Sequence, residues 1–268
     1  MEAALLGGFM VSACLFSVLL FHPDGQAARL LPDPLARRAL MGLAMGATAI
    51  ALTYSAWGKQ SGAHYNPALT LTFTRLGKVA PWDATAYIVA QFVGAVLGVM
   101  VARVLAREML GSAQVHFAVT RPGAGGAAVA FAAETVISGL LMTVVLTASN
   151  HAKAARFTGV FAGLLVATFI IVEAPLSGMS MNPARTVGSG FWAHDWTAVW
   201  VYFTAPPLGM LLAAERYLRR HGRERIFCAK LHHQNGKRCI FCEGRAGNLS
   251  PDARITARET DPLPTRPR

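Results

Sequence analysis

Hydrophobic residues along the chain gather into six long runs separated by short polar or glycine-rich stretches. Each run is close to the ~17–25 residues that a helix needs to cross the apolar part of a bilayer. The glycine-rich stretch 121–126 cannot continue a helix and separates two of the runs. The pattern predicts an all-α membrane protein with six transmembrane helices, at residues 3–21, 39–57, 83–106, 127–149, 157–173 and 196–218.

Two more apolar stretches are too short to cross a bilayer. They cover residues 66–76 and 182–192, and each begins shortly after a Ser-Gly turn. Both stretches open with the tripeptide Asn-Pro-Ala, and the surrounding pattern Ser-Gly-x3-Asn-Pro-Ala-x-Thr occurs at Ser61 and again at Ser177. Each copy follows the second long run of its half of the chain. Three crossings in each half make an inverted repeat, which places a site at the membrane midplane where the halves meet.

The tripeptides have a physical reason to start a helix inside the membrane. Asparagine is among the best N-cap residues, and proline is favoured at the first helical position because its missing N–H is no loss there. Two half-helices entering from opposite sides would meet at their N-termini, each carrying roughly half a positive charge. Such a junction repels cations and protons and admits a neutral hydrogen-bonding solute. The residues concerned are Asn66, Pro67, Ala68, Asn182, Pro183 and Ala184.

Composition agrees with a membrane protein and argues against a soluble enzyme. Apolar residues make up 53% of the 268 residues and charged residues only 15%, whereas soluble domains carry about 25% charged residues. Disorder of the whole chain is excluded, since it requires low hydrophobicity and high charge. We find no phosphate-binding loop, no nucleophile elbow and no suitably spaced pair of carboxylates. Enzymatic activity is therefore not expected.

The net charge of +11 is concentrated at one end of the chain. Residues 216–268 hold 13 of the 25 lysines and arginines, so the charge indicates a basic tail rather than a nucleic-acid-binding surface. With six crossings, the side of the tail holds 18 lysines and arginines and the other side holds 7. Cytoplasmic segments carry the excess of these residues, which predicts an inner-membrane protein with both termini in the cytoplasm. Without the tail, the two sides would hold 5 and 7 lysines and arginines, and the loops alone would not decide the orientation.

The paired tripeptides, with the residues around them, resemble the aquaporin (major intrinsic protein) family. The resemblance covers about residues 1–218, with repeats at about 1–106 and 127–218, and it also rests on Gln91. It implies six transmembrane helices plus two half-helices, assembled as a homotetramer with one pore per subunit in the lipid bilayer. It further implies a constriction at Arg185, and supporting roles near the pore for His64 and Glu134.

Three other positions line that constriction in the family. By alignment to the tripeptides and to Gly46 and Thr48, they correspond to Met45, Ile170 and Met179. Strict water channels carry an aromatic residue and a histidine here, so the apolar set leaves water-only selectivity open. Other positions, Thr186 and Gly190 among them, match the water branch of the family rather than the glycerol branch.

Two further acidic residues have roles that the sequence leaves open. Glu2 sits nearly at the terminus, and its equivalence to Glu134 in the other half is not fixed by the sequence. Glu173 lies near the outer mouth and is expected to pair with Arg185 or with a loop backbone.

The basic tail at 219–243 carries its own motif. Its candidate ligands suit a tetrahedral zinc site of three thiolates and one imidazole, and they are Cys228, His232 or His233, Cys239 and Cys242. The alternative is a basic segment on the membrane surface with incidental cysteines. Residues 244–268 are rich in proline, arginine and aspartate, and are expected to be disordered.

These observations predict a passive channel for water, with other small neutral solutes as further candidates. The channel itself requires no cofactor. One alternative is an inverted-repeat secondary transporter driven by an ion gradient, although the sequence offers few intramembrane acids to couple protons or Na⁺. A glycerol or small-solute facilitator regulated by the tail is another.

Overall fold

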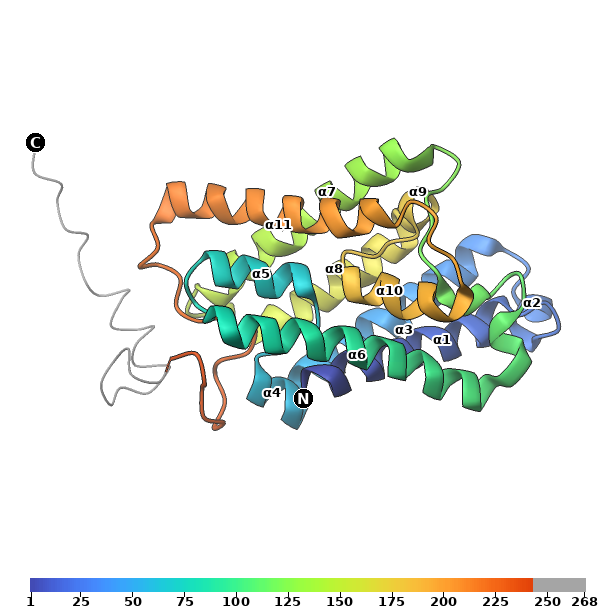
Figure 1. Ribbon diagram of the computed structural model, residues 1–268, viewed down its shortest axis with the longest axis horizontal. Helices are drawn as coiled ribbons and strands as arrows, with labels where there is room; N and C mark the ends of the chain where they lie inside the picture. The colour runs from blue at the N-terminus through green and yellow to red at the C-terminus, as the bar shows by residue number, and fades with distance from the viewer. Residues whose placement is uncertain (243–268) are drawn as a thin grey trace, which may run out of the picture.

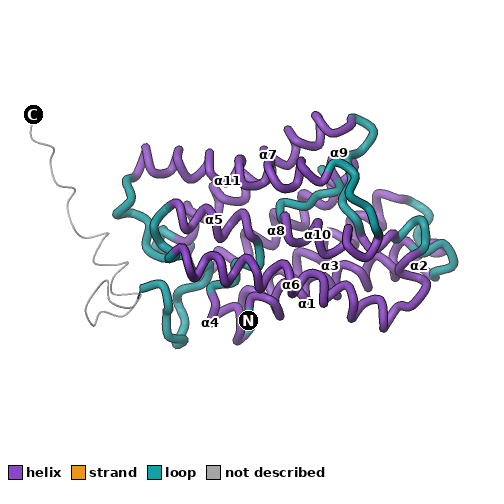
Figure 2. The backbone as a smooth tube through the Cα atoms, viewed as in Figure 1, coloured by secondary structure: helices purple, strands orange, loops and turns teal. Residues whose placement is uncertain are grey.

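A computed structural model describes residues 1–242 of the chain, and the expected disorder of 244–268 lies outside the described residues. Figure 2 shows that the described part consists of helices joined by loops, with no strand among residues 1–242. The all-helical architecture predicted from the sequence is therefore confirmed.

Six long helices run along the length of the molecule (Figure 1). Stretches containing the first five are long and apolar enough to cross a membrane. The sixth is long enough but less hydrophobic, because Glu215, Arg216 and further arginines occupy its last turns. The six helices are α1 (Glu2–Phe21), α3 (Pro34–Tyr54), α6 (Pro81–Ala106), α7 (Gly126–Ser149), α8 (Thr158–Val172) and α11 (Val199–His221).

Two short helices, α5 (Pro67–Arg75) and α10 (Pro183–Ala193), lie among the long ones. In Figure 1 they occupy opposite halves of the bundle and point their N-termini toward each other. The two Asn-Pro-Ala tripeptides therefore start two half-helices, as predicted. The remaining helices are single turns or little more, namely α2 (Gln26–Leu30), α4 (Ala56–Ser61), α9 (Ala174–Ser177), η1 (Arg107–Gly111), η2 (His116–Ala118) and η3 (Ala155–Phe157).

Small residues let the long helices approach closely within and between the repeats. Helix α1 packs on α6, α7 packs on α11 as the equivalent pair of the second repeat, and α3 packs on α8 across the repeats. A Cβ added at Gly46 would lie 2.6 Å from the backbone oxygen of Gly163 on α8. Close backbone contact of this kind is the usual way that helices associate in lipid.

The chain after α11 returns across one end of the bundle. In Figure 1 this segment leaves the end of α11 and passes beside the region of α4 and the N-terminus. Its side chains are part of the main hydrophobic core, since Ile226, Ala229 and Leu231 are all buried there. The tail is therefore packed against the bundle up to residue 242.

Candidate functional site

The two half-helices begin as their sequences dictate. The side-chain oxygen of Asn66 accepts a hydrogen bond from the N–H of Ala68 at 2.9 Å, and a proline occupies the first turn. Asn182 caps α10 in the same way, accepting from Ala184 at 3.1 Å and from Arg185 at 3.2 Å. Each asparagine thus satisfies N–H groups that a helix end inside a membrane would otherwise leave unpaired.

The same asparagines join the two repeats. The amide nitrogen of Asn66 donates to the carbonyl of Met181 at 2.7 Å, and that of Asn182 donates to the carbonyl of Tyr65 at 2.8 Å. Each capping side chain therefore binds the loop that precedes the other half-helix. This exchange brings the two helix N-termini together at the centre of the bundle.

A buried glutamate holds each of these loops. Glu134 accepts hydrogen bonds from the hydroxyl of Ser177 and from the N–H groups of Ser180 and Met181, at 2.6 to 2.8 Å. The loop needs this support because Met179 and Met181 both have positive φ angles, near 52°, which is strained for side chains of this kind.

Glu2 does the same in the first repeat. Its carboxylate accepts from the hydroxyl of Ser61 at 2.7 Å, from the N–H groups of His64 at 3.3 Å and Tyr65 at 2.6 Å, and from the amide of Gln91 at 2.7 Å. The sequence left the equivalence of Glu2 and Glu134 open because Glu2 is the first residue of α1, whereas Glu134 lies well inside α7. Their matching hydrogen bonds show that the two are structurally equivalent.

A cavity of about 230 Å³ runs past the junction of the half-helices. Both capping asparagines line it, together with His64. Most of the remaining wall is apolar. All four residues that the sequence places at the constriction also line the cavity, each from a different part of the chain: Met45 from α3, Ile170 from α8, Met179 from the loop before α10, and Arg185 from α10.

Arg185 lines this cavity and carries a hydrogen-bond donor that is unpartnered within residues 1–242. Its Nη1 atom is buried and has no partner among the described residues. Neither of the partners expected for Glu173, Arg185 or a loop backbone, is bonded to it within the described part of the chain, where both of its carboxylate oxygens are buried without a hydrogen-bond partner. A buried donor without a protein partner is costly unless a solute or water accepts from it.

His64 lies at the end of the cavity that the tail covers. Its ring lies between Phe73 and Phe241, at centroid distances of 5.3 and 5.6 Å, and its Nε2 atom is 2.9 Å from the carbonyl oxygen of Ala229. Leu231 lines the cavity itself. None of these contacts was predicted from the sequence. The apolar residues scattered through the basic tail were the signal that could have indicated them.

The candidate metal ligands of the tail are brought together. The ligand atoms of Cys228, His233, Cys239 and Cys242 all lie within 4.8 Å of one another. The sequence left the choice between the two histidines open, and the structure places His233 in the cluster. His232 instead packs edge-on against Tyr54, at a centroid distance of 4.8 Å. This cluster has the composition and spacing to hold a metal ion.

Comparison with known proteins agrees with this architecture. The sequence profile of the family described as "Major intrinsic protein" matches residues 3–217. A probable NIP-type aquaporin of Nicotiana alata is 36% identical over 162 residues, which cover 60% of this chain and 58% of that protein. A glycerol uptake facilitator-like protein of Lactiplantibacillus plantarum is 34% identical over 178 residues, covering 65% of this chain and 81% of that protein.

A solved structure shares the fold. The aquaglyceroporin of Plasmodium falciparum superimposes with a TM-score of 0.62 over 80% of this chain and 93% of its own, at 20% sequence identity. The aligned part spans less than two thirds of the plant relatives' length. With two capped half-helices meeting at a cavity inside a bundle of six long helices, the chain belongs to the major intrinsic protein family, a family of multi-pass membrane channels rather than of enzymes.

Proposed function

We propose that the chain is a passive channel for water and for small neutral solutes, and that it excludes ions and protons. The observation that carries the proposal is the junction of the two half-helices at the cavity, with Asn66 and Asn182 in its wall. The positive ends of both helix dipoles face this point, so a cation there meets unfavourable charge from two sides. A neutral solute that accepts hydrogen bonds does not.

The constriction sets which neutral solutes pass. Arg185 supplies charge and an unpaired donor, whereas Met45, Ile170 and Met179 supply an apolar wall. An apolar wall beside one donor suits a solute that has a hydrocarbon face as well as a hydroxyl or amide group. The names of the relatives, aquaporins and a glycerol uptake facilitator-like protein, agree with a range from water to small polyols.

The proposal includes the setting of the channel. The protein lies in the inner membrane with both termini in the cytoplasm, as the excess of lysine and arginine on the side of the tail indicates. It assembles as a homotetramer, as the family resemblance implies, with one pore in each subunit.

Stopped-flow light scattering on proteoliposomes tests the proposal directly. The full chain is reconstituted and challenged with osmotic gradients, first of an impermeant sugar and then of glycerol, urea and ammonia, each with and without a metal chelator. We expect water flow well above that of empty liposomes in at least one of these conditions, with no increase in proton leak measured by an internal pH dye. Water flow equal to that of empty liposomes in both conditions would refute the proposed function.

A further inference from the structure

We propose that Cys228, His233, Cys239 and Cys242 bind one Zn²⁺ ion, and that the bound metal holds residues 226–242 as a lid over the end of the cavity next to His64. The lid part of this inference rests on the proposed channel function. The metal part does not depend on it. Zinc is thereby assigned a regulatory role, because its removal would release the lid.

The arrangement of the ligand atoms suits zinc. Tetrahedral zinc with metal–ligand bonds of roughly 2.0–2.3 Å places neighbouring ligand atoms about 3.5–3.8 Å apart. The sulfur atoms of Cys228 and Cys239 are 3.4 Å apart, and the sulfur of Cys242 is 3.5 Å from Nε2 of His233. Three thiolates and one imidazole are a common set for a closed structural zinc site.

The surroundings of the cluster also suit a metal–thiolate centre. The backbone N–H of Lys230 points to the sulfur of Cys228 at 3.5 Å, the kind of outer hydrogen bond that orients a metal ligand. The Lys230 side chain is only 2% exposed, and its ammonium donates to the carbonyls of Lys237 and Arg238, at 3.4 and 3.2 Å. A zinc ion with three thiolates and one imidazole carries a net charge of −1, which compensates this buried ammonium.

The segment that the cluster holds covers the end of the cavity. Leu231 lines the cavity, and its N–H donates to the carbonyl of Gly62 at 3.1 Å. The carbonyl of Ala229 contacts His64, and the ring of Phe241 lies parallel to the ring of His64. The fit is close, because a Cβ added at Gly62 would lie 2.9 Å from Phe241.

The lid is tied to both repeats, so it crosses the opening rather than lying beside it. The N–H of Phe227 donates to the side chain of Asn150, at the end of α7 in the second repeat, at 2.6 Å. The side-chain amide of Gln60, in α4 of the first repeat, donates to the carbonyl of Arg238 at 3.3 Å.

The lid residues that line the cavity or contact His64 lie between the proposed ligands. Ala229 and Leu231 lie between Cys228 and His233, and Phe241 lies between Cys239 and Cys242. A segment this short cannot fold on a core of its own, so the metal would supply folding free energy to both loops at once. Loss of the ion would loosen the contacts with His64 and Gly62 together.

Metal content tests the site. The full-length protein, purified without a histidine tag, is analysed by mass spectrometry for zinc and iron. We expect about one zinc per chain in the wild type and in His232→Ala, a matched control outside the cluster. His233→Ala and the double variant Cys239→Ser, Cys242→Ser should lose most of it. Wild-type protein without zinc, or with a disulfide between Cys228 and Cys239, would overturn the metal site.

Water permeability of proteoliposomes tests the lid. We expect a membrane-permeant zinc chelator to raise the flow through the wild type at least about fivefold, the low end of typical coupling between two sites. The double cysteine variant should be fast without chelator and unchanged by it. Leu231→Ala should retain zinc but be faster than the zinc-loaded wild type. This variant separates the lid from the metal.

Two other outcomes of the permeability assay distinguish failure of the lid from failure of the channel function. Equal flow through the zinc-loaded wild type, the double cysteine variant and Leu231→Ala, all above empty liposomes, would overturn the lid and leave the channel function standing. No flow through any of them would refute the channel function, and the lid with it, while the metal content would still decide the zinc site.

Discussion

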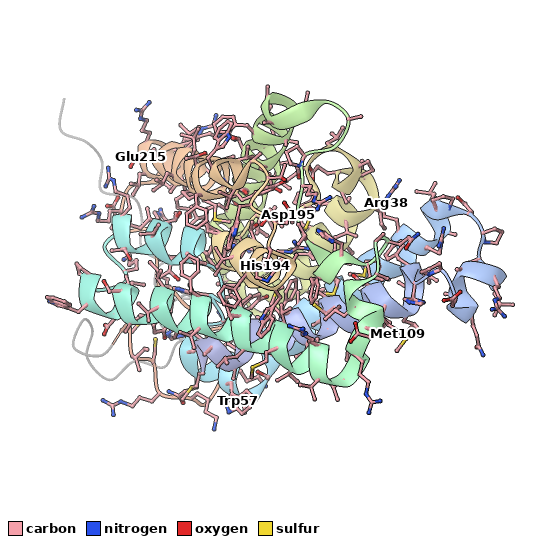
Figure 3. All side chains as sticks on the ribbon, turned by 45° about the vertical axis from the view of Figure 1, so that its right-hand side comes forward. Arg38, Trp57, Met109, His194, Asp195 and Glu215 are labelled. Carbon is pink, nitrogen blue, oxygen red and sulfur yellow. The ribbon has the colours of Figure 1, made fainter. Side chains whose placement is uncertain are left out.

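Met179 is an apolar side chain that lines the cavity, and under the proposed function we expect it to limit solute size. Replacing it by alanine removes three heavy atoms from the wall of the cavity. Met179→Ala should therefore raise glycerol or urea permeability several-fold while water flow changes less. Swelling assays on proteoliposomes measure both. Met109→Ala is the matched control, because Met109 is 46% exposed on the outside of the molecule, where Figure 3 labels it. An unchanged solute profile would remove Met179 from the constriction.

A second prediction at the scale of one residue concerns Glu134. Its carboxylate accepts two hydrogen bonds at Oε1 and one at Oε2, whereas a glutamine has only one acceptor oxygen and presents an amide N–H₂ to at least one of these donors. Each buried donor left unpaired costs about 1–3 kcal/mol. Glu134→Gln should therefore unfold at a clearly lower temperature in detergent. Glu108→Gln, at an exposed carboxylate, should not. Equal melting temperatures would contradict the supporting role of Glu134.

The sequence predicted those site residues that act through local rules. Asn66 and Asn182 cap the helices they precede, so their role could be inferred from a few neighbouring letters. The contact of His64 with Ala229 could not, because it joins residues far apart in the chain. The choice between His232 and His233 also depended on which of the two rings packs against Tyr54, and no local sequence pattern indicates this.

Among the elements, the pair α1 and α6 depends on close backbone contact. A Cβ added at Gly98 would lie 2.4 Å from the backbone oxygen of Gly7, which is too close without movement of a helix. We expect Gly98→Ala to destabilise the bundle by about 1–3 kcal/mol, as overpacking does. Gly8→Ala is the control, since its Cβ would meet only Leu52 at an ordinary 3.6 Å. Thermal unfolding in detergent compares the two variants, and equal stability would contradict the packing described here.

The loop between α10 and α11 is tied to distant loops by Asp195, which Figure 3 labels. Its carboxylate accepts from Arg121 and lies 3.3 Å from His116. Burial raises the pKa of Asp195, but hydrogen bonds from Thr197 and Arg121 outweigh it, and the pKa falls to about 2. Because the folded pKa lies below the unfolded value of 3.8, the resulting stability is present above about pH 4 and is lost as the pH falls toward 2.

Asp195→Asn should therefore lower stability by about 1 kcal/mol at neutral pH, since Arg121 is half exposed and the pair is partly screened. The difference from the wild type should shrink below pH 4. Melting curves at several pH values measure this, with the exposed Asp83→Asn as control. A difference that grows on acidification would contradict the assignment.

Element boundaries were less predictable than element identity. The second long helix was expected at 39–57 but spans Pro34–Tyr54. Arg37 and Arg38 lower the hydropathy of its first turns, so its true start lies before the apolar run. The capping signal was present, since Asp33 accepts from the N–H of Leu35 and a proline follows it. Ser55 ends the helix early by capping α4.

At the scale of the whole molecule, orientation can be tested by reporters. With both termini in the cytoplasm, a green fluorescent protein fused to the C-terminus should fluoresce, and alkaline phosphatase at the same position should be inactive. Alkaline phosphatase inserted into the 22–33 loop, one crossing away from the N-terminus, should be active and serves as the control. The reverse pattern would show that the basic tail does not determine the topology.

The exchange of hydrogen bonds between the two capping asparagines has a consequence for how the protein can move. A secondary transporter of inverted-repeat design rocks one repeat against the other to expose its site alternately. Here such rocking would pull Asn66 from Met181 and Asn182 from Tyr65, leaving buried groups unpaired at about 1–3 kcal/mol each. The atoms that begin the half-helices thus hold the repeats in one relative position. A passage with so fixed a centre is best controlled at its ends, by parts that can detach without disturbing it.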